Sequence, residues 1–116
     1  MLSFLPLVLL ACWTPERFAE EYPVALCDVY TRCEWAIAAY YWDILANPTQ
    51  EAADENAAMQ VDMVCDYPEE FDLACDFDAA DARTCIHDLE LQNCNVFTDP
   101  SYSWPEECET ACPDPG

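Results

Sequence analysis

Residues 14–46 have the sequence TPERFAEEYPVALCDVYTRCEWAIAAYYWDILA, and the spacing of their apolar side chains decides the fold. Thr14, Pro15 and Glu16 are typical of a helix start: threonine caps free amides, proline fits the first turn and an acid faces the positive end of the dipole. Apolar residues then recur every three or four positions, which predicts one long amphipathic helix ending at Asn47-Pro48. The stripe consists of Phe18, Tyr22, Leu26, Val29, Tyr30, Cys33, Ile37, Tyr40 and Ile44.

Two features of this helix leave alternatives open. Pro23 either kinks the helix or marks the first turn of a helix that starts near Tyr22. Trp35 and Trp42 lie seven residues apart, so they share a face that points away from the stripe. A helix that is apolar nearly all round is normally buried, which favours a central core helix. The other interpretation is an exposed aromatic patch of Trp35, Tyr41 and Trp42 that binds a ligand or partner.

Further helices are expected after this stretch. Thr49 caps a second helix, which the run Asp66-Tyr67-Pro68 breaks. A short helix is predicted over Glu69–Cys75. Asp78 with Asp81 three residues later approximates a capping box and opens another helix that ends near residues 93–95. The expected inward residues are Ala53, Ala57, Val61 and Val64 in the second helix, Phe71 and Ala74 in the short one, and Ala82, Cys85, Ile86 and Leu89 in the last.

Composition supports an all-α fold, a small bundle of about four helices. The single glycine is Gly116, whereas small strand-rich domains need glycine in their tight turns. The formal net charge is −21, from three arginines and 24 acidic residues. Such a chain repels nucleic acid and anionic lipid headgroups, so neither is expected as a partner. Weak binding of divalent cations is expected from so acidic a surface.

The run Leu9-Leu10-Ala11-Cys12 follows a short apolar segment and resembles the lipobox of bacterial lipoproteins, in which the cysteine is lipidated. No Lys or Arg precedes the apolar segment, so the signal is unusually short or the true start lies upstream. The alternatives are that Cys12 is an ordinary cysteine after a peptidase site, or that residues 2–11 begin a buried helix. The apolar run is too short to span a membrane.

The cysteine count agrees with lipidation. Nine cysteines are an odd number, and assigning Cys12 to a lipid leaves eight for four disulfides, which an oxidising compartment sustains. Eight cysteines allow 105 pairings. Cys27 and Cys33 point to different sides of one helix, and Cys108 and Cys112 have near-parallel side-chain vectors, so bridges are expected between segments. They would tie the short turn that begins at Pro105 to the helical body. The expected disulfide cysteines are Cys27, Cys33, Cys65, Cys75, Cys85, Cys94, Cys108 and Cys112.

The run from Asp78 to Leu89, followed by Cys94, together with the lipobox, resembles small cysteine-rich bacterial lipoproteins. This resemblance implies a signal peptide at 1–11, a lipidated N-terminus at 12–14, a single helical domain at 15–112 and a tail at 113–116. It also implies a lipid anchor in the bacterial cell envelope. Trp13 replaces the aspartate that retains lipoproteins at the inner membrane, which favours the outer membrane or cell surface. The resemblance implies no activity.

No catalytic residue, metal site or cofactor is predicted. His87 and Cys85 are two residues apart on a helix and therefore do not face each other. Cys108 and Cys112 approach a zinc-ligand spacing, but export favours disulfides. The run Asp76–Asp81 fails as a calcium loop, because an EF-hand needs other residues at its fifth, sixth and twelfth positions.

The sequence therefore predicts a lipid-anchored, acidic structural or binding module, with an envelope protein as a possible partner. Two alternatives stay open. One is a receptor for a cationic or aromatic ligand that uses the Trp35–Trp42 patch. The other is a small secreted hydrolase or inhibitor that uses the carboxylates between Asp66 and Asp81.

Overall fold

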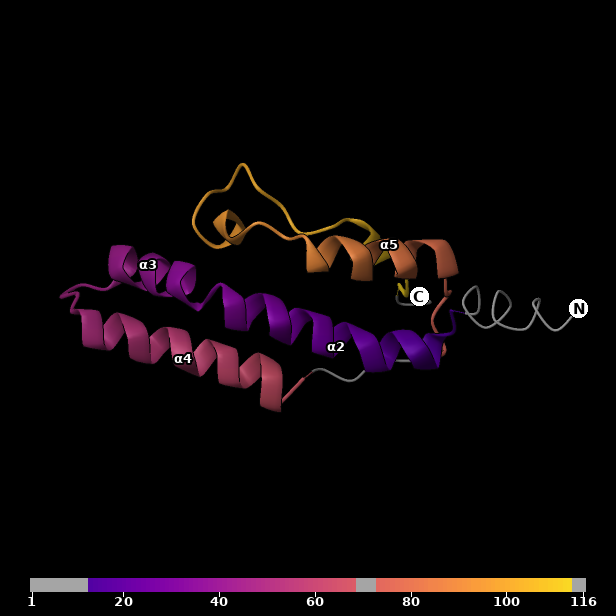
Figure 1. The fold of residues 1–116 in the computed structure, drawn as a ribbon, viewed down its shortest axis with the longest axis horizontal. Coiled ribbons are helices and arrows are strands. Elements are labelled where there is room, and N and C mark those ends of the chain that lie inside the picture. The colour runs from indigo at the N-terminus through magenta and orange to yellow at the C-terminus, as the bar shows by residue number, and fades with distance from the viewer. Residues whose placement is uncertain (1–12, 69–72, 114–116) are drawn as a thin grey trace, which may run out of the picture.

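The computed structural model describes residues 13–68 and 73–113, and it confirms the all-α fold (Figure 1). No strand occurs within these two ranges. The elements are the α-helices α2 (Pro15–Arg32), α3 (Glu34–Ile44), α4 (Gln50–Asp66), α5 (Ala79–Glu90) and α6 (Glu107–Thr110), and the 3₁₀ helix η1 (Cys94–Phe97).

Helix α2 begins as expected but ends earlier. The Thr14 hydroxyl accepts a hydrogen bond from the Arg17 amide at 3.1 Å, and the helix continues through Pro23, so a start near Tyr22 is wrong. The prediction of one helix as far as residue 46 is also wrong. Cys33 has φ −104° and ψ 13° and separates α2 from α3. The fully buried side chain of Cys33 is bonded to Cys94. No glycine or proline lies next to Cys33 to indicate a break in the helix.

Helices α3 and α4 form an antiparallel hairpin, which lies at the left of Figure 1. The Thr49 hydroxyl caps α4 by accepting a hydrogen bond from the Ala52 amide at 3.0 Å, as predicted. Small side chains let the two helices approach closely. The buried residues of this hairpin core are Ile37, Ala38, Ala53, Ala57 and Val61.

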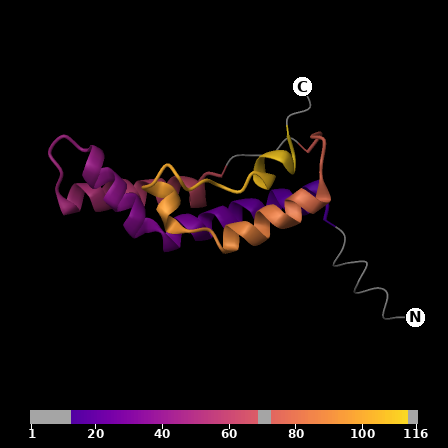
Figure 2. The same ribbon diagram turned by 90° about the horizontal axis from the view of Figure 1, so that it is seen from above.

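Helices α2, α5 and α6 form the body of the molecule, and Figure 2 shows α5 running alongside α2. Asp78 caps α5 by accepting a hydrogen bond from the Asp81 amide at 2.9 Å, which confirms the predicted cap. The Thr110 hydroxyl donates to the Asp81 carboxylate at 2.7 Å and so fastens α6 to the start of α5. The buried residues of this body core are Phe18, Val29, Cys33, Ala82, Cys85, Ile86, Leu89 and Ala111.

Four disulfides join these elements, which confirms the prediction of a disulfide-stapled bundle. Every bridge links different segments of the chain, and two of them hold the C-terminal turn. The pairs are Cys27–Cys65, Cys33–Cys94, Cys75–Cys112 and Cys85–Cys108.

Three local predictions differ from the structure. Of the helix expected over Glu69–Cys75, residues 69–72 lie outside the described residues, and residues 73–75 form a turn and a bend rather than a helix. Helix α5 ends at Glu90, before the expected end. Cys94–Phe97 form a 3₁₀ turn where the end of that helix and the start of a loop were expected.

Candidate ligand-binding site

Three aromatic rings meet where the hairpin joins the body, and we call Tyr30, Phe97 and Trp104 the aromatic junction. Tyr30 stacks on Trp104 with ring centroids 5.9 Å apart and 11° between the planes. Phe97 stands edge-on to both rings, with centroids 5.0 Å from Tyr30 and 5.4 Å from Trp104. Phe97 packs against both cores, Tyr30 against the hairpin core and Trp104 against the body core. Burial raises the pKa of the Tyr30 hydroxyl.

Two of the three rings belong to residues 94–108, which we call the bridged loop because a disulfide holds each end. Cys94 is bonded to Cys33 at the α2–α3 break, and Cys108 is bonded to Cys85 on α5. Within the loop, the Asp99 carboxylate accepts hydrogen bonds from the Ser101 amide at 2.9 Å and hydroxyl at 2.8 Å. These two bonds, the amide's first, lower the pKa of Asp99. The loop therefore presents Phe97 and Trp104 from a fixed backbone.

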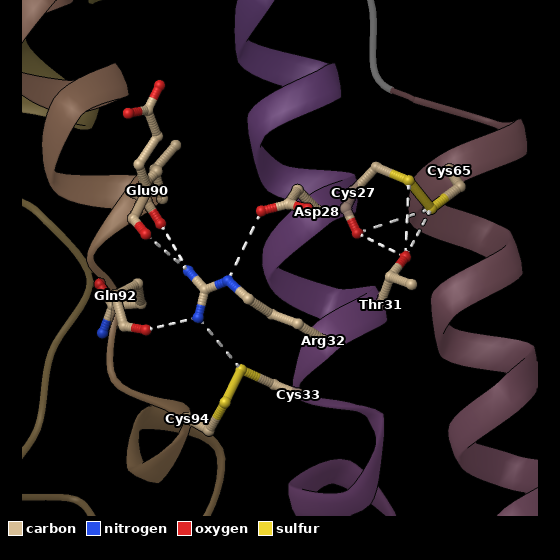
Figure 3. Close-up of polar contacts among 10 residues, drawn as sticks. Cys27, Asp28, Thr31, Arg32, Cys33, Cys65, Glu90, Gln92 and Cys94 are labelled. Carbon is tan, nitrogen blue, oxygen red and sulfur yellow. Dashed lines mark hydrogen bonds and ion pairs between the residues drawn. A yellow bond between two sulfur atoms is a disulfide. The ribbon is translucent and has the colours of Figure 1, made fainter.

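Arg32 braces the segment that leads from α5 into the bridged loop (Figure 3). Its guanidinium donates to the carbonyl oxygens of Leu89 and Gln92, both at 2.8 Å, and lies 3.5 Å from the Asp28 carboxylate. The charge thus sits at the C-terminal end of α5, where the helix dipole is negative. Because Cys33 follows directly, one turn of α2 fixes both the end of α5 and the start of the loop.

A pocket of about 230 Å³ opens beside the junction, between α2, α3, α4 and η1. Its walls are aromatic and aliphatic, with tyrosine hydroxyls and one glutamine amide as polar groups. We call this the aromatic pocket. It is lined by Tyr30, Ile37, Tyr40, Tyr41, Gln60, Val96 and Phe97.

Two further pockets continue along the bridged loop. The middle pocket, of about 280 Å³, shares Tyr30 with the aromatic pocket and adds Trp104 and Glu109. The acidic pocket, of about 440 Å³, shares Trp104 and Pro105 with the middle pocket. Three carboxylates line the acidic pocket, those of Asp88, Glu106 and Glu107. Among the residues described as lining the three pockets, none is Lys, Arg or His.

Trp35 and Trp42 of the predicted aromatic patch are exposed on one face of α3, whereas Tyr41 lies on another face. Tyr41 is half-buried and lines the aromatic pocket, whereas Trp35 and Trp42 are outside that lining. Trp35 is 64% exposed and Trp42 44% exposed, so the interpretation of central burial is wrong. Tyr41 follows Trp35 by six residues, which places the two side chains about 120° apart around the helix.

The other chemistry-bearing residues take structural or surface positions. Cys85 is bonded to Cys108, and His87 is exposed with Nδ1 3.3 Å from the Asp88 carboxylate. Of the carboxylates between Asp66 and Asp81, Asp78 caps α5 and Asp81 accepts the bond from Thr110. Across residues 13–68 and 73–113, no group of three or more His, Cys, Asp or Glu side chains is placed to hold a metal ion. Cys12 lies outside the described residues.

Sequence reasoning missed Phe97 and Trp104. Phe97 ends the short 3₁₀ helix η1 and Trp104 lies in irregular chain, and neither segment is long enough for hydrophobic periodicity to give a signal. Their context is the remaining clue: with Tyr102 they make three aromatic residues in a segment that contains two serines and two prolines, between Cys94 and Cys108. A loop that is fastened at both ends can hold aromatic side chains against a helix, which a free loop of that composition would not.

No protein-family model, curated protein or solved structure matches this chain. Within the part of the chain that the structure describes, no helix is both long and apolar enough to cross a membrane.

Proposed function

We propose that this protein is a binding module of a bacterial cell envelope, anchored by a lipid on Cys12, that takes its ligand in the aromatic pocket. The observation that carries the proposal is the aromatic junction. It places an apolar pocket on a scaffold that two disulfides and Arg32 hold in one arrangement. A preformed site loses little conformational freedom when a ligand binds.

Three features support the anchoring part of this proposal. The sequence around Cys12 resembles a lipobox, and the eight remaining cysteines are all paired in disulfides. Disulfides of this number persist in exported proteins rather than in a reducing cytosol. Trp13 after the cysteine favours the outer membrane or surface over the inner membrane. An intact mass of residues 12–116 plus lipid, for protein extracted from bacterial membranes, is the expected result. An unlipidated mass with a free thiol on Cys12 would contradict the anchor.

Two matched variants test the pocket. The probe is N-phenyl-1-naphthylamine, a neutral apolar dye whose fluorescence rises when it leaves water. Tyr40 and Trp42 lie on the same helix with nearly equal exposure, 43% and 44%, but only Tyr40 lines the aromatic pocket. We expect Tyr40→Ala to weaken dye binding about tenfold, the effect of losing roughly 1.4 kcal/mol of ring contact.

Trp42→Ala is the control and should leave dye binding within about twofold of the parent protein. The reverse pattern, in which Trp42→Ala weakens binding and Tyr40→Ala does not, would place the ligand on the exposed Trp35–Trp42 face instead. Absence of dye binding to the parent protein would contradict an accessible apolar pocket.

A further inference from the structure

The three pockets along the bridged loop differ in chemistry. The aromatic pocket contains no charged side chain, the middle pocket contains Glu109, and the acidic pocket contains three carboxylates. Neighbouring pockets share wall residues, Tyr30 between the first two and Trp104 with Pro105 between the last two. The three pockets therefore adjoin one another around the bridged loop, and we call them together the groove.

From this combination of an uncharged aromatic pocket and adjoining acidic pockets we infer that the natural ligand is a peptide segment that carries aromatic or aliphatic residues next to lysines or arginines. This inference rests on the proposed function and names its ligand class. Charge complementarity supports a cation, because the chain carries a net charge of −21 and the groove walls contain carboxylates without a basic side chain. The aromatic pocket supplies the matching apolar contacts for the other part of the ligand.

Pocket size favours an extended chain over one compact molecule. Sites for drug-sized ligands usually span roughly 300–1,000 Å³. The aromatic and middle pockets, of about 230 and 280 Å³, fall below that range, so each suits one side chain. The Gln60 amide lines the aromatic pocket and is a hydrogen-bonding group for a peptide backbone.

Other occupants fit less well. A second copy of this chain would bring another net charge of −21 to an acidic groove, and the two copies would repel each other. A simple polycation would leave the aromatic pocket empty and would contact only the carboxylates. Trp104, which stacks on Tyr30 and lines the last two pockets, offers a ring face to an ammonium or guanidinium group.

The test uses the full-length protein and a labelled decapeptide with two phenylalanines followed by three lysines, measured by fluorescence anisotropy. The first variant is Asp88→Asn/Glu106→Gln/Glu107→Gln, which neutralises the acidic pocket. The matched control, Glu51→Gln/Glu55→Gln/Asp62→Asn, removes three exposed charges on α4, outside the groove. Both variants change the net charge by the same amount, so their difference reports the local carboxylates.

We expect the acidic-pocket variant to weaken peptide binding about tenfold and the α4 control less than twofold, since exposed ion pairs are each worth a few tenths to about 1 kcal/mol. A high concentration of NaCl should weaken binding to the parent protein much more than binding to the acidic-pocket variant. A version of the peptide with glutamates in place of the lysines should not bind. Circular dichroism and thermal unfolding confirm that the variants fold.

Failure of this inference differs from failure of the proposed function. If Tyr40→Ala weakens dye and peptide binding but the acidic-pocket variant does not, the aromatic pocket is a binding site and the cationic ligand is wrong. If spermidine competes as well as the peptide, the ligand is a plain polycation and the peptide assignment is wrong. If sedimentation shows a dimer that Tyr40→Ala dissociates, the groove holds a second copy and the inference is overturned.

Discussion

The body and the hairpin are held together in different ways. The body buries large side chains, with Phe18, Val29 and Leu89 almost fully removed from solvent, and three of the four disulfides have at least one end in its buried core or its C-terminal turn. The hairpin core is built largely from alanines, with Ile37 and Val61 as its larger residues. Because stability from burial scales with apolar area, the hairpin gains less from its core. Its attachment to the body through Cys27–Cys65 and Cys33–Cys94 therefore matters more.

The largest expected effect comes from emptying the body core. Phe18 is fully buried and lies 5.4 Å from the Tyr22 ring and 6.3 Å from the Phe77 ring, measured between centroids. Phe18→Ala should lower the free energy of unfolding by about 3–5 kcal/mol, through lost burial and the cavity left behind. Urea unfolding of the oxidised protein measures this loss. The hairpin variant Val61→Ala, which removes a smaller buried side chain, should cost less. An equal loss would contradict the contrast between the two cores.

Two disulfides close loops of almost the same length and allow the next comparison. Cys27–Cys65 spans 38 residues and Cys75–Cys112 spans 37, so chain entropy assigns both a contribution of about 2–4 kcal/mol. Cys27→Ala/Cys65→Ala removes the covalent link between α4 and α2, whereas Cys75→Ala/Cys112→Ala removes the link that holds the C-terminal segment. We expect the first variant to lose amide protection throughout α4, as measured by hydrogen exchange.

The second variant should keep the protection of α4 and lose it near α6. The two bridges close loops of nearly equal length, so removing either one should change the entropy of the unfolded chain by the same amount. Any difference between the two variants therefore reports the contact that each bridge holds in the folded protein. Equal exchange patterns in the two variants would mean that the hairpin is stable without its bridge to the body.

A smaller effect is expected from Arg32. Arg32→Gln removes the hydrogen bonds that the guanidinium donates to carbonyls at and just after the end of α5. The free energy of unfolding should fall by only about 1–2 kcal/mol, because water reaches the one-third-exposed side chain and replaces part of these bonds. Arg32→Lys should restore only part of this loss, since an ammonium group lacks the planar fork that reaches two carbonyls. Thermal unfolding measures both.

Arg17 provides the control for Arg32. Its guanidinium pairs with Glu21 one turn along α2 and lies 3.9 Å from the centre of the Trp13 ring, so all its contacts are local. Arg17→Gln should lower the free energy of unfolding by only about 0.3–1 kcal/mol. A larger loss from Arg17→Gln than from Arg32→Gln would contradict the bracing role of Arg32.

Features with local causes could be predicted from the sequence, whereas features that depend on distant residues could not. The helix starts at Thr14, Thr49 and Asp78 follow from local chemistry, because each cap accepts a hydrogen bond from an amide three residues later. The break at Cys33 could not be predicted, since the local sequence favours helix. Cys33 is bonded to a residue 61 positions away, and no local pattern indicates such a partner. The pairing of the cysteines is non-local for the same reason.

The site was less predictable than the fold. The apolar stripe of α2 and α3 was expected to face the core, and Phe18, Val29 and Ile37 do so. Tyr30 and Tyr40 belong to the same stripe, yet they line a pocket, because the bridged loop covers only part of that face. Hydrophobic periodicity identifies which face of a helix packs against other elements. It does not identify the residue at which that packing ends.

The smallest expected effect concerns Tyr30, where the two parts meet. Burial raises the pKa of Tyr30 above the ordinary value of about 10, so the folded protein keeps this proton at a pH where the unfolded chain has lost it. The unfolded state then binds fewer protons than the native state, and stability falls as the pH rises above about 10. Tyr30→Phe removes this dependence. The variant should therefore lose less stability than the parent protein between neutral and strongly alkaline pH, as measured by urea unfolding in a pH series.

Tyr102→Phe is the control, because its ring is exposed and lies outside the aromatic junction. Near neutral pH, Tyr30→Phe should change stability by no more than about 1 kcal/mol, because the ring contacts with Phe97 and Trp104 are kept. If the alkaline loss begins at the junction, hydrogen exchange at high pH should open the aromatic pocket and η1 before it reaches the body core. Simultaneous exchange of hairpin, junction and body would instead show that the two parts unfold as one unit, despite their different cores.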